Sequence, residues 1–148
     1  MTDLGTLGGV WGAASALNNR GQVIGTSSLA ADPGACLGIG NTANCHPFLW
    51  DAAKNNGKLL DLTVQSGGKF VAANAINEHG DIAGLGDFSG THDAALWGNG
   101  VVTDLGHLAG DCSSQAFAIN SRVQVIGWSV LCNGSVRSFL WENGSMVD

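Results

Sequence analysis

The sequence predicts an all-β fold made of three tandem units, each with four antiparallel strands, and one repeat domain over all 148 residues. The first observation behind this prediction is a block that occurs three times, at residues 14–25, 73–84 and 116–127. The second is the spacing of these copies along the chain. The third is a composition with 23 glycines, only 6 lysines and arginines, and no run of helical periodicity, which favours short strands joined by turns.

The spacing of the repeated block predicts the size of each unit. Asn77 and Asn120, which are equivalent, lie 43 residues apart, and this period suits a four-stranded blade of a β-propeller. Asn18 and Asn77 lie 59 residues apart because the first unit carries an insertion after Ser28. The units are therefore expected at about residues 3–60, 61–103 and 104–148.

The repeated block predicts two strands around a tight turn, because small or apolar residues alternate with polar ones on either side. Gly21 and Gly80 supply the positive φ that this turn needs, whereas Val123 in the third copy predicts a slightly different turn. A third strand is then expected around Trp50, Trp97 and Trp141, whose recurrence marks them as core residues. Asn-Gly pairs at 56–57, 99–100 and 143–144 predict the hairpin that leads into each fourth strand.

Two further motifs carry a resemblance to a known family. Residues 3–9 read Asp-Leu-Gly-Thr-Leu-Gly-Gly and residues 104–110 repeat this with two changes, while weaker tripeptides begin at His46, Asp93 and Arg137. With the repeated block, these motifs make nearly the whole chain resemble the bacterial HAF repeat, an extracellular family. The resemblance implies secretion and a β-propeller-like fold, and it implies no catalytic residue set.

The four cysteines predict two disulfides. Cys112 and Cys132 flank the first hairpin of the third unit, where cross-strand neighbours approach closely enough for a bridge. Cys36 and Cys45 bracket part of the glycine-rich insertion, which a bridge would restrain. A metal site would need tighter cysteine spacing, and disulfides indicate an extracellular or cell-surface location. The first residues do not form a signal peptide, so an export signal is expected to have been removed or to lie upstream.

Both ends of the chain resemble fourth strands, and three blades are too few to close a ring. We expect a head-to-tail homodimer that forms one six-bladed ring; the alternative is a piece of a longer array. A net charge of −6 and a pI near 4.8 argue against nucleic acid and anionic membranes as partners. No apolar run approaches the roughly 20 residues that cross a bilayer.

The loops that join second to third strands, and one unit to the next, are expected on one face. They differ between units, as the loops of a binding face do. Aromatic rings there could stack on a glycan, although an aromatic plug between units explains them equally well. The candidate ligand-binding residues are Trp11, Phe70, Phe88, Trp128, His46 and His107.

A catalytic alternative uses Ser89, His92 and Asp93 as nucleophile, base and orienting carboxylate, with His46 or His107 as substitute bases. Such close sequence neighbours rarely reach triad geometry, and the Gly-x-Ser-x-Gly elbow is missing. His79 is expected in a turn on the opposite face. Calcium is the cation that aspartate oxygens would suit, although turn-capping or solvated carboxylates are favoured. The cation candidates are Asp32, Asp87, Asp93 and Asp111.

Two functions follow from these features. The preferred one is a secreted recognition or scaffold module that binds a glycan or another extracellular ligand on the variable loop face. The alternative is a small secreted serine hydrolase of the esterase or lipase type that uses the same loops. The module is preferred because no catalytic residue recurs between units, and the one cluster consists of sequence neighbours that rarely reach triad geometry. No cofactor is expected.

Overall fold

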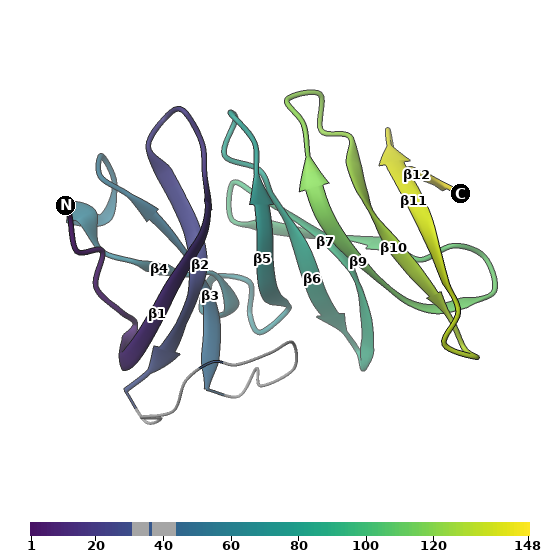
Figure 1. The fold of residues 1–148 in the computed structure, drawn as a ribbon, viewed down its shortest axis with the longest axis horizontal. Coiled ribbons are helices and arrows are strands. Elements are labelled where there is room, and N and C mark those ends of the chain that lie inside the picture. The colour runs from purple at the N-terminus through teal and green to yellow at the C-terminus, as the bar shows by residue number, and fades with distance from the viewer. Residues whose placement is uncertain (31–35, 37–43) are drawn as a thin grey trace.

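The computed structural model describes residues 1–30, 36 and 44–148, and these residues form three four-stranded antiparallel sheets (Figure 1). In every sheet the strands are hydrogen-bonded in chain order. The first sheet contains β1 (Gly8–Leu17), β2 (Gln22–Leu29), β3 (Cys45–Asp51) and β4 (Leu60–Asp61). The second contains β5 (Phe70–Ile76), β6 (Ile82–Phe88), β7 (Thr91–Gly98) and β8 (Val101–Gly106). The third contains β9 (Asp111–Ile119), β10 (Val125–Leu131), β11 (Val136–Glu142) and β12 (Ser145–Val147).

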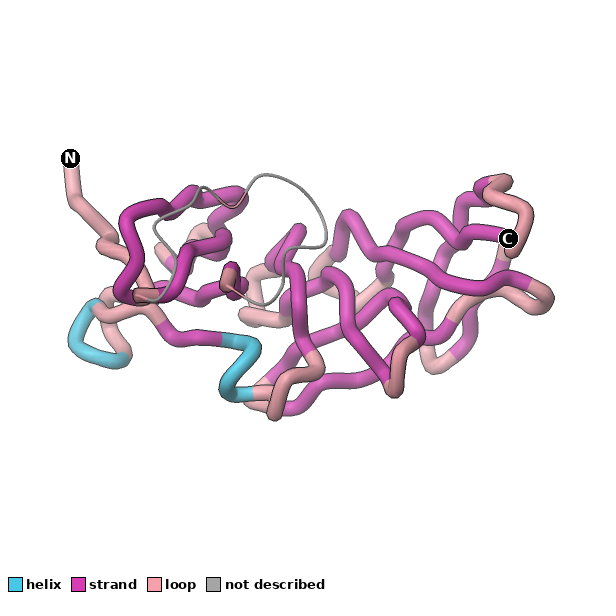
Figure 2. The backbone as a smooth tube through the Cα atoms, turned by 90° about the horizontal axis from the view of Figure 1, so that it is seen from below, coloured by secondary structure: helices cyan, strands magenta, loops and turns pink. Residues whose placement is uncertain are grey.

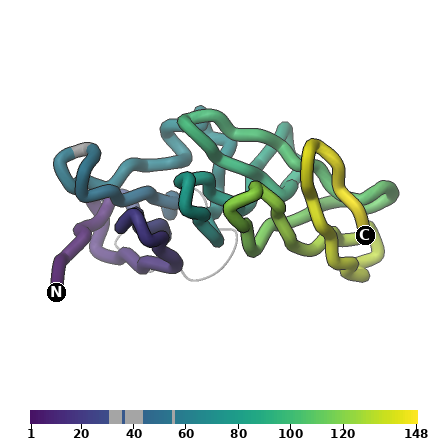
Figure 3. The backbone as a smooth tube through the Cα atoms, turned by 90° about the horizontal axis from the view of Figure 1, so that it is seen from above, coloured from purple at the N-terminus to yellow at the C-terminus, as the bar shows by residue number. Residues whose placement is uncertain are grey.

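The sheets follow one another along the long axis of the molecule, with the chain ends at opposite ends (Figures 2 and 3). The expected all-β fold with three four-stranded antiparallel units is therefore confirmed. The sequence suggested no helix, but two short ones are present, η1 (Asn55–Gly57) and α1 (Leu62–Gln65). Asp61 caps α1 by accepting a hydrogen bond from the Val64 amide at 2.9 Å, and Leu62 is fully buried.

The core is divided between the two sheet-to-sheet interfaces. The first interface buries apolar side chains from the first and second sheets, including Ile24, Phe70 and Ile82, each of which is 0% exposed. The second interface buries Ala83, Val125 and their neighbours from the second and third sheets. Each sheet thus buries apolar side chains against the next, as expected for stacked repeats.

The first hairpin turn of each unit is organised by its asparagine. The Asn18 side-chain oxygen accepts hydrogen bonds from the Arg20 and Gln22 amides at 3.1 and 3.0 Å. Asn77 and Asn120 accept the equivalent pairs of bonds in their own turns. These asparagines also join the units, because the Asn18 side-chain amide donates to the Asn77 carbonyl at 2.9 Å, and Asn77 donates to the Asn120 carbonyl at 3.1 Å.

The expectation that Val123 changes the third turn is wrong. Val123 adopts a φ of 60°, close to the 75° of Gly21, and its amide donates to the Asn120 carbonyl at 3.0 Å, as the Gly21 amide does to Asn18. The hydrogen bonds around Asn120 hold this β-branched residue in a left-handed conformation that such residues rarely adopt.

Replacing Val123 with glycine should therefore stabilise the protein. We expect the free energy of unfolding of Val123→Gly to rise by about 1 kcal/mol, because glycine adopts positive φ without steric cost. Urea unfolding measures this difference, and Gly80→Val, at the equivalent turn, should lower the free energy by a similar amount. Unchanged stability in both variants would contradict the strained geometry.

Each first strand contains a β-bulge at the variable residue of its Ala-x-Ala motif. The register shifts at Ser15 in β1, at Asn74 in β5 and at Phe117 in β9. Ser15 Oγ lies 3.5 Å from the Ala73 carbonyl, and the Asn74 amide donates to the Ala116 carbonyl at 2.7 Å. The bulges therefore link the three first strands to one another.

Both expected disulfides are confirmed. Cys112 and Cys132 close the open end of the β9–β10 hairpin with a Cα–Cα distance of 5.2 Å. Cys36 and Cys45 are bonded with a Cα–Cα distance of 5.8 Å. Disulfides persist in oxidising compartments, so the two bridges are consistent with an extracellular protein. Among the described residues, no helix is long and apolar enough to cross a membrane.

Candidate functional site: a groove along the first strands

A groove of about 610 Å³ runs along the first strands of all three sheets. Cavities of this size are typical of small-ligand sites. Its walls come from β1, β5 and β9, with additional side chains from β2, β6, β7 and β10, and the Cys36–Cys45 disulfide borders it. The described lining residues are Trp11, Ala13, Ala14, Ser15, Thr26, Cys36, Cys45, Val71, Ala72, Asn74, Leu85, His92, Ser113, Ser114, Gln115, Trp128 and Val130.

The described lining of the groove is uncharged apart from one histidine, and it has aromatic rings at two places. Trp11 comes from the first sheet and Trp128 from the third, and Trp128 is 42% exposed. None of the described lining residues is Asp, Glu, Lys or Arg, and His92 is the one histidine among them. The groove therefore suits a neutral ligand.

Polar side chains stand between these aromatic rings. Asn74 and Ser15 are the bulge residues of β5 and β1, and their bonds to the next unit hold them at fixed positions. The Trp128 ring is held by an edge-to-face contact with Phe117, with ring centroids 4.5 Å apart and planes at 70°. The groove thus offers preformed hydrogen-bonding groups beside preformed aromatic surfaces.

The structure places two of the six expected ligand-binding residues, Trp11 and Trp128, in this groove. Phe70 is fully buried in the first interface, and Phe88 packs against the same cluster, so these rings act as plugs between units. His46 and His107 pair with aspartates outside the groove lining. Sequence reasoning missed Asn74, Gln115 and the serines because it placed the site on loops, whereas the lining comes mainly from strands.

The structure does not bring Ser89, His92 and Asp93 together as a triad. Ser89 occupies the tip of the β6–β7 hairpin, with a φ of 60°. His92 and Asp93 are neighbours in β7 and point to opposite faces, as successive strand residues do. Asp93 is buried and pairs instead with His107, Nδ1 to Oδ1 at 2.7 Å. Among the described residues, neither His46 nor His107 hydrogen-bonds to a serine hydroxyl.

The variable first residue of each tripeptide, His46, Asp93 or Arg137, pairs with an acidic or basic side chain. His46 pairs with Asp61 at 2.7 Å, Asp93 with His107 at 2.7 Å, and Arg137 with Asp111 at 2.7 Å. This first residue is basic in the first and third units and acidic in the second. Its partner is acidic where it is basic and basic where it is acidic. Arg137 also contacts Asp148 at 3.3 Å, the position equivalent to Asp61. These side chains have a structural role in linking strands.

Two aspartates have a pKa below the ordinary value of 3.8. Burial by itself would raise the pKa of Asp111, but the Arg137 guanidinium outweighs burial and lowers it. Burial by itself would likewise raise the pKa of Asp51. Hydrogen bonds from Gln22 and the Ala53 amide, together with nearby cations, outweigh burial and lower this pKa. The charged pair also raises the pKa of Arg137. Both carboxylates are therefore stabilised in the folded state.

These pKa shifts predict acid sensitivity. Because the folded pKa of each carboxyl lies below its unfolded value, the unfolded state binds more protons, and stability falls with falling pH. The loss of stability should begin near pH 3.8, the ordinary pKa of the carboxyl, and continue as the pH falls through the lower folded pKa values. Urea unfolding at a series of pH values measures it. Arg137→Gln should lower the stability at neutral pH and make the loss on acidification smaller, because without the guanidinium burial raises the folded pKa of Asp111. An unchanged pH profile in this variant would contradict the pairing.

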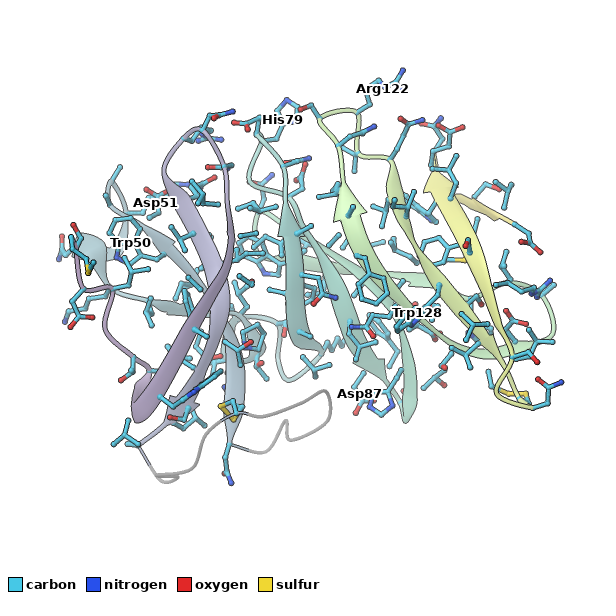
Figure 4. The ribbon with its side chains drawn as sticks, viewed as in Figure 1. Trp50, Asp51, His79, Asp87, Arg122 and Trp128 are labelled. Carbon is cyan, nitrogen blue, oxygen red and sulfur yellow. A yellow bond between two sulfur atoms is a disulfide. The ribbon has the colours of Figure 1, made fainter. Side chains whose placement is uncertain are left out.

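The cation candidates do not gather at one place. Asp93 and Asp111 are each engaged with a basic side chain, and Asp87 accepts a hydrogen bond from the Gly90 amide at 3.0 Å as a turn cap. Asp32 lies outside the described residues. Within residues 1–30, 36 and 44–148, no three His, Cys, Asp or Glu side chains are grouped to hold a metal ion. His79, as expected, lies at the opposite edge from Asp87 (Figure 4).

Comparison with family models, with curated proteins and with solved structures finds no match to this chain.

Proposed function

We propose that this chain is a secreted recognition module that binds a neutral glycan in the groove along its first strands. The observation that carries the proposal is that the described lining contains no Asp, Glu, Lys or Arg, and has partly exposed tryptophans on the first and third sheets with amides and hydroxyls between them. The C–H faces of a sugar ring pack on aromatic rings, and its hydroxyl groups need hydrogen-bonding partners. An acidic or basic ligand would find no opposite charge among the described lining residues.

We further infer that the three sheets are blades of a β-propeller-like array of the HAF type. The first strands lie together at the groove, joined by the bulge residues, which is how the inner strands of propeller blades are arranged. The 43-residue repeat and the motif at residues 3–9 support the same inference. The two disulfides support secretion.

The test of the proposed function is calorimetric titration with cellohexaose, xylohexaose, maltohexaose and chitohexaose. We expect one class to bind, and we expect Trp11→Ala to weaken this binding about tenfold or more, equivalent to about 1.4 kcal/mol. His79→Ala, at the opposite edge, is the control and should bind as the unaltered protein does. Failure of all four oligosaccharides, or binding unaffected by Trp11→Ala, would contradict the proposal.

The serine hydrolase remains the alternative, and a serine-reactive phosphonate separates the two functions. The module should stay unlabelled. Labelling that Ser89→Ala abolishes would favour the hydrolase, because it would require an activated hydroxyl at the hairpin tip.

A further inference from the structure

The outer face of the third sheet exposes apolar side chains that the other two sheets bury. Ile126 on β10 is 52% exposed, whereas the equivalent Ile24 and Ala83 are each 0% exposed against the next sheet. Leu140, directly opposite Ile126 on β11, is half-buried, while its equivalent Leu49 is 7% exposed. We call this surface the end face, defined by Phe117, Ile126, Trp128 and Leu140.

The hydrogen bonds that run from the turn asparagine of one unit to that of the next also stop at this end. Asn18 and Asn77 each donate a side-chain N–H to the asparagine carbonyl of the following unit. Within the described part of the chain, Asn120 donates only to Gln124, at 2.7 Å. Among the same described residues, the Asn18 carbonyl accepts the Gly21 amide of its own turn and no asparagine side chain. The third unit therefore has an available donor in the Asn120 side-chain amide, and the first unit has an available acceptor in the Asn18 carbonyl.

The outer face of the first sheet is built like an internal one. The Leu7 amide donates to Ser27 Oγ at 2.9 Å. The equivalent bond in the third sheet, from the Leu108 amide to Ser129 Oγ at 3.0 Å, lies on the side that packs against the second sheet. Val23 on this face is half-buried, whereas the equivalent Val125 is fully buried against a neighbouring sheet. The first sheet therefore has the features of a surface that receives another unit.

We propose that the end face of one copy binds the outer face of the first sheet of a second copy, repeating the contacts between its own units. The Asn120 side chain then donates to the partner's Asn18 carbonyl, and Ile126 is buried beside the partner's Val23. This head-to-tail contact is heterologous, and two copies that close on each other form one ring of six sheets. Trp128 belongs to both the end face and the groove, but Ile126 and Val23 are not groove residues, so variants at these two positions test the contact separately from glycan binding.

Light scattering on the intact chain, over a range of protein concentration, tests the contact. We expect a mass near twice 15.1 kDa for the unaltered protein, and 15.1 kDa for Ile126→Asp at the same concentrations. Val101→Asp is the matched control, because Val101 is 64% exposed on the outermost strand of the second sheet, and this variant should still associate. Circular dichroism establishes that each variant is folded.

A mixing experiment tests the direction of the contact. Val23→Asp alone should also be monomeric, because it blocks the receiving face. Mixed with Ile126→Asp, it should form a one-to-one complex, since each variant retains the face that the other lacks. A monomeric unaltered protein at every concentration, association that survives Ile126→Asp, or a mixture that stays monomeric would each overturn the proposal.

Discussion

Gly84→Ala should prevent the second sheet from forming. A Cβ at Gly84 would collide with the Ala72 carbonyl oxygen and lie 3.2 Å from the Phe70 ring, which is fully buried. The β-bulge at Asn74 fixes this close approach, so neither strand can move without breaking the bond from Asn74 to the third sheet. We expect a loss of about 4 kcal/mol or more in the free energy of unfolding, measured by urea unfolding, or no folded protein at all.

Gly12→Ala is the control for this prediction. Gly12 also lies in a first strand, but the nearest atom to a Cβ there is Thr6 Cγ2 at 3.5 Å, an ordinary contact. Its stability should stay within about 0.5 kcal/mol of the unaltered protein. The same collision recurs at Gly25 and Gly127, which explains the invariant glycine of the repeated block. Normal stability of Gly84→Ala would contradict the bulged geometry.

Asn18→Asp should destabilise the protein much more than Asn120→Asp. Both substitutions keep the oxygen that accepts the two turn amides, and both lose the donor to a glutamine at the fourth following position. Only Asn18→Asp also removes the bond to Asn77 and leaves a buried carboxylate facing that carbonyl oxygen. We expect a loss of about 3 kcal/mol for Asn18→Asp and about 1 kcal/mol for Asn120→Asp.

Urea unfolding of both variants, each combined with Ile126→Asp to remove the proposed contact between copies, measures this difference. It should be determined at neutral pH, where both introduced carboxyls would be ionised if they were in water. Equal losses in the two variants would mean that the bond between Asn18 and Asn77 contributes nothing to the packing of the first sheet on the second.

The repeats made much of the fold predictable from sequence. The Asn-Gly pairs at 99–100 and 143–144 are hairpin turns with both residues at positive φ, as type I′ turns require. The Cys112–Cys132 disulfide was predictable because the β9–β10 hairpin brings both cysteines to its open end, next to the pair Asp111 and Leu131. The expected core role of the repeated tryptophans holds fully for Trp97, which is 7% exposed, while Trp50 and Trp141 are half-buried.

Other features depend on contacts between units and were not visible in the sequence. A bulge at the middle residue of Ala-x-Ala does not alter the alternating pattern enough to be recognised, so the groove position of Asn74 was missed. The pairing of Asp93 with His107 rather than with His92 follows from the alternation of side chains in β7 and from the path of the chain after β8. Aromatic residues that differ between units were predicted to bind a ligand, but Phe70 is one of them and it packs in the first interface.

The central claim is that a neutral glycan binds along the first strands, and the indole N–H signals of the five tryptophans test it most directly. In ¹⁵N-labelled protein, titration with the oligosaccharide that binds most tightly should shift the signals of Trp11 and Trp128. The signals of Trp50, Trp97 and Trp141, which lie outside the groove, should stay in place. Shifts confined to these last three, or no shift at saturation, would contradict the proposed site.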